Sequence, residues 1–136
     1  MAFNIIYYNK IKKEDYGMDD NHRVGQLVIK FGTGTLLGRD GNLDQQIFNS
    51  VARQVVAMQE RGTDITIVSS GAIKAGRERM EGLRTNNGSL NKKELAGVGA
   101  RHLLNRWGEA FGEHREEVAQ IWVTFANWSD KNERQS

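Results

Sequence analysis

The residues best suited to chemistry form a glycine-rich loop behind a short apolar run. Residues 27–29 are apolar, Lys30 follows them, and the next loop contains Gly32, Thr33 and Gly34. Glycines let backbone amides approach a phosphate closely, and successive amides can form an anion-binding concavity. The loop therefore predicts a site for a transferring phosphoryl group, with Lys30 as its positive charge. The same residues are equally compatible with a strand-to-helix turn and a surface lysine.

This first loop matches neither of two familiar nucleotide-binding motifs. A Rossmann fingerprint needs a third glycine where this chain has Leu37, and the Gly-Lys-Ser/Thr triplet of a Walker A loop is absent. If the loop binds phosphate, its geometry belongs to neither fold.

A second loop, residues 69–72, separates the apolar run 65–68 from a predicted helix. Unpaired N–H groups and the helix dipole at such a point stabilise a carboxylate or a phosphate. Ser70 offers a hydroxyl donor there, beside Gly71 and Ala72. A serine at this place is explained more simply as a helix N-cap, and a nucleophilic role would need a positioned base.

Periodicity predicts the elements that position these loops. Short apolar runs indicate strands, including one over residues 27–29 that we expect to be buried on both faces. Asp44 is a plausible helix cap, Gly62 fits a helix C-terminus, and Ser129 with Asp130 predicts the start of a last helix. The predicted strands are 26–29, 65–68 and 118–124, and the predicted helices are 44–62, 72–80 and 91–111.

This alternation of strands and helices predicts an α/β fold with a parallel sheet. Ligands bind at the carboxyl edge of such sheets, where the loops after each strand meet. The predicted helices carry two apolar stripes. The first has Ile47, Val51, Val55 and Met58, with Phe48 and Ala52 beside them, and the long helix has Leu95, Val98, Leu103, Trp107 and Phe111.

Composition excludes several classes of protein. The 136 residues include no cysteine, which excludes disulfides and thiolate catalysis, and the net charge of +2 is too mild to argue for nucleic-acid binding. No segment approaches the ~20 apolar residues of a membrane span, so we expect a cytoplasmic protein. Three histidines, His22, His102 and His114, give no metal-binding cluster, and His102 is expected to be a partly buried packing residue. Residues 1–24 are expected to form a mobile extension.

Four segments together resemble the glutamate 5-kinase family of the amino-acid kinase superfamily. They cover residues 26–124 and appear in the order expected for that family. The matching segments are Val28-Ile29-Lys30-Phe31-Gly32-Thr33, Ile67-Val68-Ser69-Ser70-Gly71-Ala72-Ile73 with Gly76, Lys93-Glu94-Leu95-Ala96-Gly97-Val98-Gly99 with Leu103, Trp107 and Phe111, and Val118-Ala119-Gln120-Ile121 ending at Thr124.

The resemblance implies an αβα sandwich with a mainly parallel sheet, of which residues 25–136 would be the N-terminal part. It implies that ATP, with magnesium, phosphorylates the side-chain carboxylate of L-glutamate at the start of proline synthesis. Lys30 would contact the ATP phosphates, as would the loop residues Gly32, Thr33 and Gly34. Ser70 would contact glutamate, assisted by Thr33, Gly71 and Ala72. Family members often have serine or alanine where this chain has Gly34, so the first loop is expected to be looser.

The aspartate- and asparagine-rich substrate segment, the second lysine and the nucleotide-binding half of the family do not occur in this sequence. We therefore expect the chain alone to be inactive, and we expect a homo-oligomer, because a partial sheet exposes strand edges and apolar faces. Two alternatives stay open. One is a non-catalytic α/β module that binds an anion or a partner chain, and the other is an amino-acid kinase acting on aspartate, acetylglutamate or carbamate.

Overall fold

The computed structural model describes residues 3–8, 25–83 and 90–123. From residue 25 onwards, strands and helices alternate as the sequence predicts. The elements in chain order are β1 (Phe3–Tyr8), β2 (Gln26–Phe31), the 3-10 helix η2 (Thr33–Leu36), α1 (Gln45–Glu60), β3 (Asp64–Ser69), α2 (Ala72–Gly82), α3 (Lys92–Gly112) and β4 (Ile121–Val123). The helix predicted at Ser129 and Asp130 lies outside the described residues.

The four strands form one sheet in the order β2-β3-β1-β4. β2 pairs with β3 in parallel, whereas β1 is antiparallel to both β3 and β4. Three strands therefore share one direction, and β1 runs against them. β1 lies within residues 1–24, which the sequence analysis predicts to be an extension. Residues 3–8 of this segment are part of the sheet.

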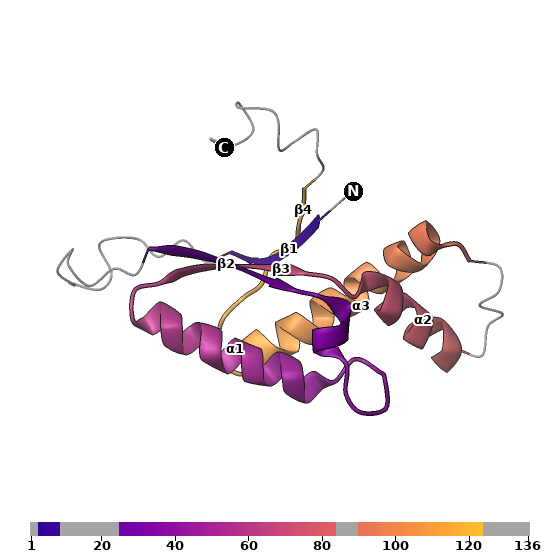
Figure 1. Cartoon of the computed structure of the whole chain (residues 1–136), viewed down its shortest axis with the longest axis horizontal. Helices are drawn as coiled ribbons and strands as arrows, with labels where there is room; N and C mark the ends of the chain where they lie inside the picture. The colour runs from indigo at the N-terminus through magenta and orange to yellow at the C-terminus, as the bar shows by residue number, and fades with distance from the viewer. Residues whose placement is uncertain (1–2, 9–24, 84–89, 124–136) are drawn as a thin grey trace.

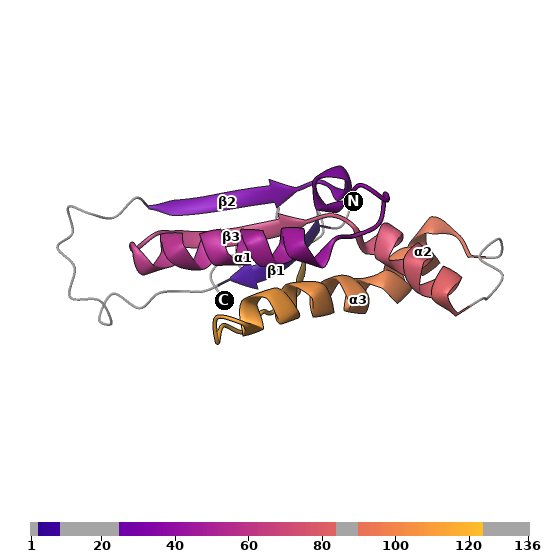
Figure 2. The ribbon, with the colours of Figure 1, turned by 90° about the horizontal axis from the view of Figure 1, so that it is seen from below.

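The helices α1 and α3 cover one face of this sheet, and α2 lies beyond the end of the strands (Figures 1 and 2). The α/β class predicted from the sequence is confirmed. The described elements supply two of the three layers expected, a sheet and one layer of helices.

Local signals explain where the helices begin and end. Asp44 caps α1, because its side chain accepts a hydrogen bond from the Gln46 amide. Gly62 follows α1 with a left-handed φ of 89°, as predicted for a C-terminal glycine. At the start of α3, Asn91 and Glu94 form a reciprocal capping box.

Trp107 of α3 is the centre of the core. Its indole packs edge-on against Phe48 of α1, with ring centroids 4.7 Å apart, and it also contacts the Phe31 and Phe111 rings. The stripe predicted on α3 is confirmed at Leu95 and Leu103. On α1 the buried residues are Phe48, Ala52, Val55 and Gln59, and the predicted Ile47, Val51 and Met58 are partly buried against the core.

The prediction that residues 27–29 are buried on both faces is wrong. β2 is an edge strand, and helices cover only one of its faces, so Val28 keeps 65% of its surface exposed. Ile29 and Phe31 point to the covered face and pack against the core. The strand predicted at 118–124 is also shorter than expected, because regular pairing begins only at Ile121.

Candidate functional site

Parallel pairing of β2 and β3 brings the two predicted loops together. Lys30 is opposite Val68, and Phe31 is opposite Ser69. The loops that follow the two strands therefore leave the sheet side by side, at the carboxyl ends of the strands. The Ser70 amide then donates a hydrogen bond of 2.9 Å to the Phe31 carbonyl oxygen. This contact joins the start of one loop to the start of the other, as expected for neighbouring parallel strands.

The first loop is a single 3-10 turn. Gly32 precedes it, and the amide and hydroxyl of Thr35 both donate to the Gly32 carbonyl oxygen, at 3.2 and 2.6 Å. Leu36 is fully buried and anchors the end of the turn. Thr33 is half-buried, whereas Gly32 and Gly34 are exposed.

The fold itself does not require glycine at these two exposed positions. Neither residue has a positive φ, a Cβ at Gly34 would meet nothing within 4 Å, and one at Gly32 would reach only Thr35 Oγ1 at 3.9 Å. The surface above both glycines is therefore open to a ligand, and their backbone can be approached closely.

Lys30 is exposed near the end of β2, just before this loop. Because side chains alternate along a strand and Ile29 and Phe31 face the helices, Lys30 faces the opposite side of the sheet. No salt bridge pairs it with any residue of the described part of the chain. Its ammonium group is thus available to an external anion.

The two serines of the second loop have different surroundings. Ser69 is buried, accepts a 3.1 Å hydrogen bond from the Trp107 indole N–H, and donates to the Ser70 carbonyl oxygen. Ser70 is half-buried, and its hydroxyl has no hydrogen bond to the residues that the structure describes. Ser69 is therefore a structural residue, and Ser70 presents the free hydroxyl.

The simpler explanation of Ser70 as a helix cap is wrong. The N-cap of α2 is Gly71, and no side chain caps this helix end. Gly71 has a φ of 117°, a backbone conformation that disfavours other residues, whereas a Cβ there would make only an ordinary contact with Leu103, at 3.4 Å. The amides that begin α2 at the buried Ala72 therefore lack a side-chain partner, beside the Ser70 hydroxyl.

Two glycines fix the position of this helix start by letting α2 and α3 cross closely. A Cβ on Gly99 would overlap the carbonyl oxygen of Ala72, and a Cβ on Gly76 would overlap that of Leu95. The role of Gly76 and Gly99 in the crossing of α2 and α3 could not be predicted from the sequence, because it depends on how the two helices pack.

Glu78 on α2 supports the segment between η2 and α1, and sequence analysis did not single it out. Its carboxylate accepts a 2.8 Å hydrogen bond from the Leu43 amide and forms salt bridges with Lys74 at 3.6 Å and Arg106 at 3.5 Å. Three elements meet at this carboxylate, which only the tertiary structure could reveal.

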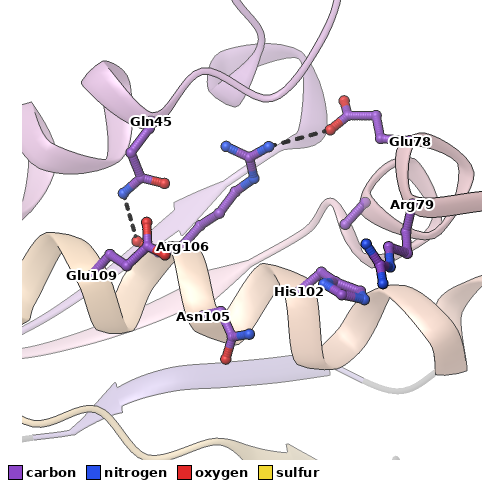
Figure 3. A pocket seen from close by; sticks show the side chains of 8 residues that line it. Gln45, Glu78, Arg79, His102, Asn105, Arg106 and Glu109 are labelled. Atoms are coloured by element: carbon purple, nitrogen blue, oxygen red, sulfur yellow. Dashed lines mark hydrogen bonds and ion pairs between the residues drawn. The ribbon is translucent and has the colours of Figure 1, made fainter. Parts of the chain in front are cut away.

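A cavity of about 430 Å³ lies away from the glycine loops, between the start of α1, α2 and α3 (Figure 3). It contains none of the site residues predicted from the sequence. His102 lines it and is half-buried, in keeping with the expectation of partial burial. Its lining residues are Gln45, Ala75, Glu78, Arg79, His102, Asn105, Arg106 and Glu109.

Within residues 3–8, 25–83 and 90–123, no group of three or more His, Asp or Glu side chains could hold a metal ion. No helix in that part of the chain is long and apolar enough to cross a membrane.

Comparison with known proteins defines the class to which this fold and these loops belong. Residues 25–136 match the Amino acid kinase family, so the chain belongs to that family.

The similar curated proteins within it are named Glutamate 5-kinase. The chain is 38% identical over 103 residues to that of Citrifermentans bemidjiense, 37% over 107 residues to that of Dehalococcoides mccartyi strain CBDB1, and 38% over 108 residues to that of Thermus thermophilus. These matches cover 75–79% of this chain but only 27–29% of the relatives. The chain thus spans less than a third of the length of those enzymes.

Proposed function

We propose that this chain provides the first two substrate-binding loops of a glutamate 5-kinase. The reaction would transfer the γ-phosphoryl group of ATP to the side-chain carboxylate of L-glutamate, in proline biosynthesis. One observation carries the proposal: the hydrogen bond from the Ser70 amide to the Phe31 carbonyl oxygen places a glycine loop beside a free helix N-terminus. Phosphoryl transfer depends mainly on positioning and on charge stabilisation, which such an arrangement supplies.

The first loop is assigned to ATP. The fold has space for a Cβ at both Gly32 and Gly34, so packing does not explain why these residues are glycines. A ligand that must approach the backbone closely does explain it. Lys30 contributes an unpaired positive charge next to them. We assign Lys30 to the phosphates and Gly32, Thr33 and Gly34 to the surrounding cradle.

The second loop is assigned to L-glutamate. The uncapped start of α2 at Gly71 and Ala72 carries a partial positive charge that stabilises a carboxylate. The Ser70 hydroxyl can donate to the same group, and we assign Thr33 of the first loop to the same substrate. These residues position the acceptor, and Lys30 stabilises charge on the transferring phosphoryl group.

Magnesium is implied by the family, but the described residues do not fit a protein-held magnesium site. Mg²⁺ prefers carboxylate oxygens together with substrate phosphates, and these loops offer no cluster of carboxylates. The chemistry assigned to this chain is positioning and charge stabilisation by Lys30, Ser70 and the loop amides.

A hydroxylamine trap for acyl phosphate tests the proposal in two forms. The chain alone should give no signal above blank, because catalytic parts that act as a unit lose orders of magnitude when separated. A chimera, in which residues 25–124 replace the matching segment of the Thermus thermophilus Glutamate 5-kinase, should form hydroxamate with L-glutamate and ATP. A folded chimera that prefers aspartate, acetylglutamate or carbamate would support another amino-acid kinase. A folded chimera without any such activity would support a non-catalytic module.

We further propose a cytoplasmic homo-oligomer. Val28 and Ile121, on different strands of the sheet, keep 65% and 46% of their surface exposed. Burial of such side chains favours association. Light scattering should show a species larger than a monomer, and a stable monomer at high concentration would contradict this.

A further inference from the structure

The first loop continues into a short hairpin, residues 37–43, before α1 begins. Leu37 and Leu43 form an antiparallel bridge at the base of this hairpin. The next residue, Asp44, donates its amide hydrogen to the Leu36 carbonyl oxygen at 3.0 Å. Leu36 is the fully buried end of η2, so a contact that fixes Leu43 also fixes the end of the first loop.

The helix α2, which begins at the second loop, holds Leu43 in two ways. The side chains of Leu36 and Leu43 lie beside Gly71, since a Cβ at Gly71 would be 3.8 Å from each of them. The Leu43 amide donates a hydrogen bond of 2.8 Å to Glu78 Oε1. Leu43 is only 5% exposed, and a buried amide without a partner is costly. Glu78 is therefore the acceptor that keeps the base of the hairpin against α2.

Two cations orient the Glu78 carboxylate towards the hairpin. Figure 3 shows the Arg106 guanidinium pointing towards Glu78, and its nitrogen lies 3.5 Å from Oε2. Lys74 lies 3.6 Å from Oε1 and also donates to Asn42 Oδ1 of the hairpin, at 3.1 Å. These ion pairs are partly exposed, so they contribute little stability by themselves. Their effect is to orient Glu78, and the bond to the Leu43 amide makes the connection.

The second loop is held in place by other contacts. Trp107 of α3 donates a hydrogen bond to Ser69 at the end of β3. The close crossing of α2 and α3 at Gly99 fixes the start of α2 at Ala72. Neither contact involves Glu78. Loss of the Glu78 carboxylate should therefore release the first loop and leave the second loop in place.

We propose that Glu78 is a positioning residue that holds the first loop at the correct distance from the second. The proposal rests on the proposed function, in which Lys30 and the first loop bind ATP and Ser70 binds L-glutamate. Glu78 belongs to neither loop and acts through the Leu43 amide. In phosphoryl transfer, a displacement of about 1 Å between reacting groups can lower the rate about a hundredfold. A slightly displaced first loop would still bind ATP but would transfer the phosphoryl group slowly.

Steady-state kinetics of the chimera with the Thermus thermophilus enzyme separates positioning from binding. Glu78→Ala should lower kcat about ten- to a hundredfold and leave the KM for glutamate nearly unchanged. Glu78→Gln should retain most of kcat, because its amide oxygen can still accept from the Leu43 amide. Glu81→Ala is the matched control and should have no effect, because Glu81 is exposed on the same helix. An unchanged kcat in Glu78→Ala, or an equal loss in Glu78→Gln, would overturn the proposal.

Amide hydrogen exchange of the full chain, followed by nuclear magnetic resonance, tests the same role without any activity. Glu78→Ala should accelerate exchange of the Leu43 amide about tenfold or more, whereas Glu78→Gln should not. The Ser70 amide, bonded to the Phe31 carbonyl oxygen, should keep its protection in both variants. No acceleration at Leu43, equal acceleration at Ser70, or loss of the folded state in Glu78→Ala would overturn the proposal. If the unmodified chimera is inactive, the proposed function fails, and the exchange rates still decide whether Glu78 holds the first loop.

Discussion

The indole N–H of Trp107 donates a hydrogen bond of 3.1 Å to Ser69 Oγ, and both residues are buried. This bond ties the C-terminal half of α3 to the last residue of β3, one residue before Ser70. The position of the candidate substrate loop thus depends directly on the core.

Ser69→Ala should destabilise the protein by about 1–3 kcal/mol, because it leaves the buried indole N–H without an acceptor. Chemical denaturation followed by tryptophan fluorescence measures the change. Ser70→Ala is the matched control and should leave the stability nearly unchanged, since its hydroxyl has no partner in the described structure. The opposite ranking would make Ser70 the structural serine.

Gly99→Ala should destabilise the protein by at least about 1–3 kcal/mol, because the added methyl group overlaps the Ala72 carbonyl oxygen. Gly97 is on the same helix, and a Cβ there would meet no atom within 4 Å. Gly97→Ala should therefore stabilise the protein by up to about 1 kcal/mol, because alanine has the higher helix propensity. Thermal melts of both variants check the pair. Equal effects would mean that α2 and α3 do not cross at Gly99.

The free energy of unfolding should decrease as the pH falls below about 6.5, the ordinary pKa of histidine. Burial and three nearby arginines lower the pKa of His102 in the folded state, so the unfolded chain binds more protons in this window. His102→Gln should reduce the slope of stability against pH, and Arg79→Gln should reduce it partly. Urea titrations across this pH range measure the slopes. An unchanged slope in His102→Gln would contradict the assignment.

Most helices and strands could be predicted from the sequence, because their ends are determined by interactions between residues close together in the chain. Asp44 and Gly62 mark the ends of α1 through hydrogen bonds and backbone conformation within a few residues. Burial was harder to predict, because it depends on what covers an element. Residues 27–29 look like a buried strand, yet they lie at the edge of a sheet that has helices on only one face.

The candidate loops could be predicted because glycine-rich loops after parallel strands must meet at one edge, and the contact between Phe31 and Ser70 confirms that they do. The cavity could not be predicted. Gln45, Arg79 and His102 come from three helices, and no short motif announces that they converge. The strand at residues 3–8 carries no clear periodic signal, and its partners lie far away in the sequence.

The most direct test is steady-state kinetics of the chimera with both ATP and L-glutamate varied. Lys30→Ala should lower kcat far more than it raises the KM for glutamate, because the lysine charge meets the transferring phosphoryl group. Ser70→Ala should raise the KM for glutamate about ten- to a hundredfold, as expected for loss of a hydrogen bond to a charged group. The account is contradicted if Ser70→Ala leaves the glutamate dependence unchanged, or if Lys30→Ala retains full kcat.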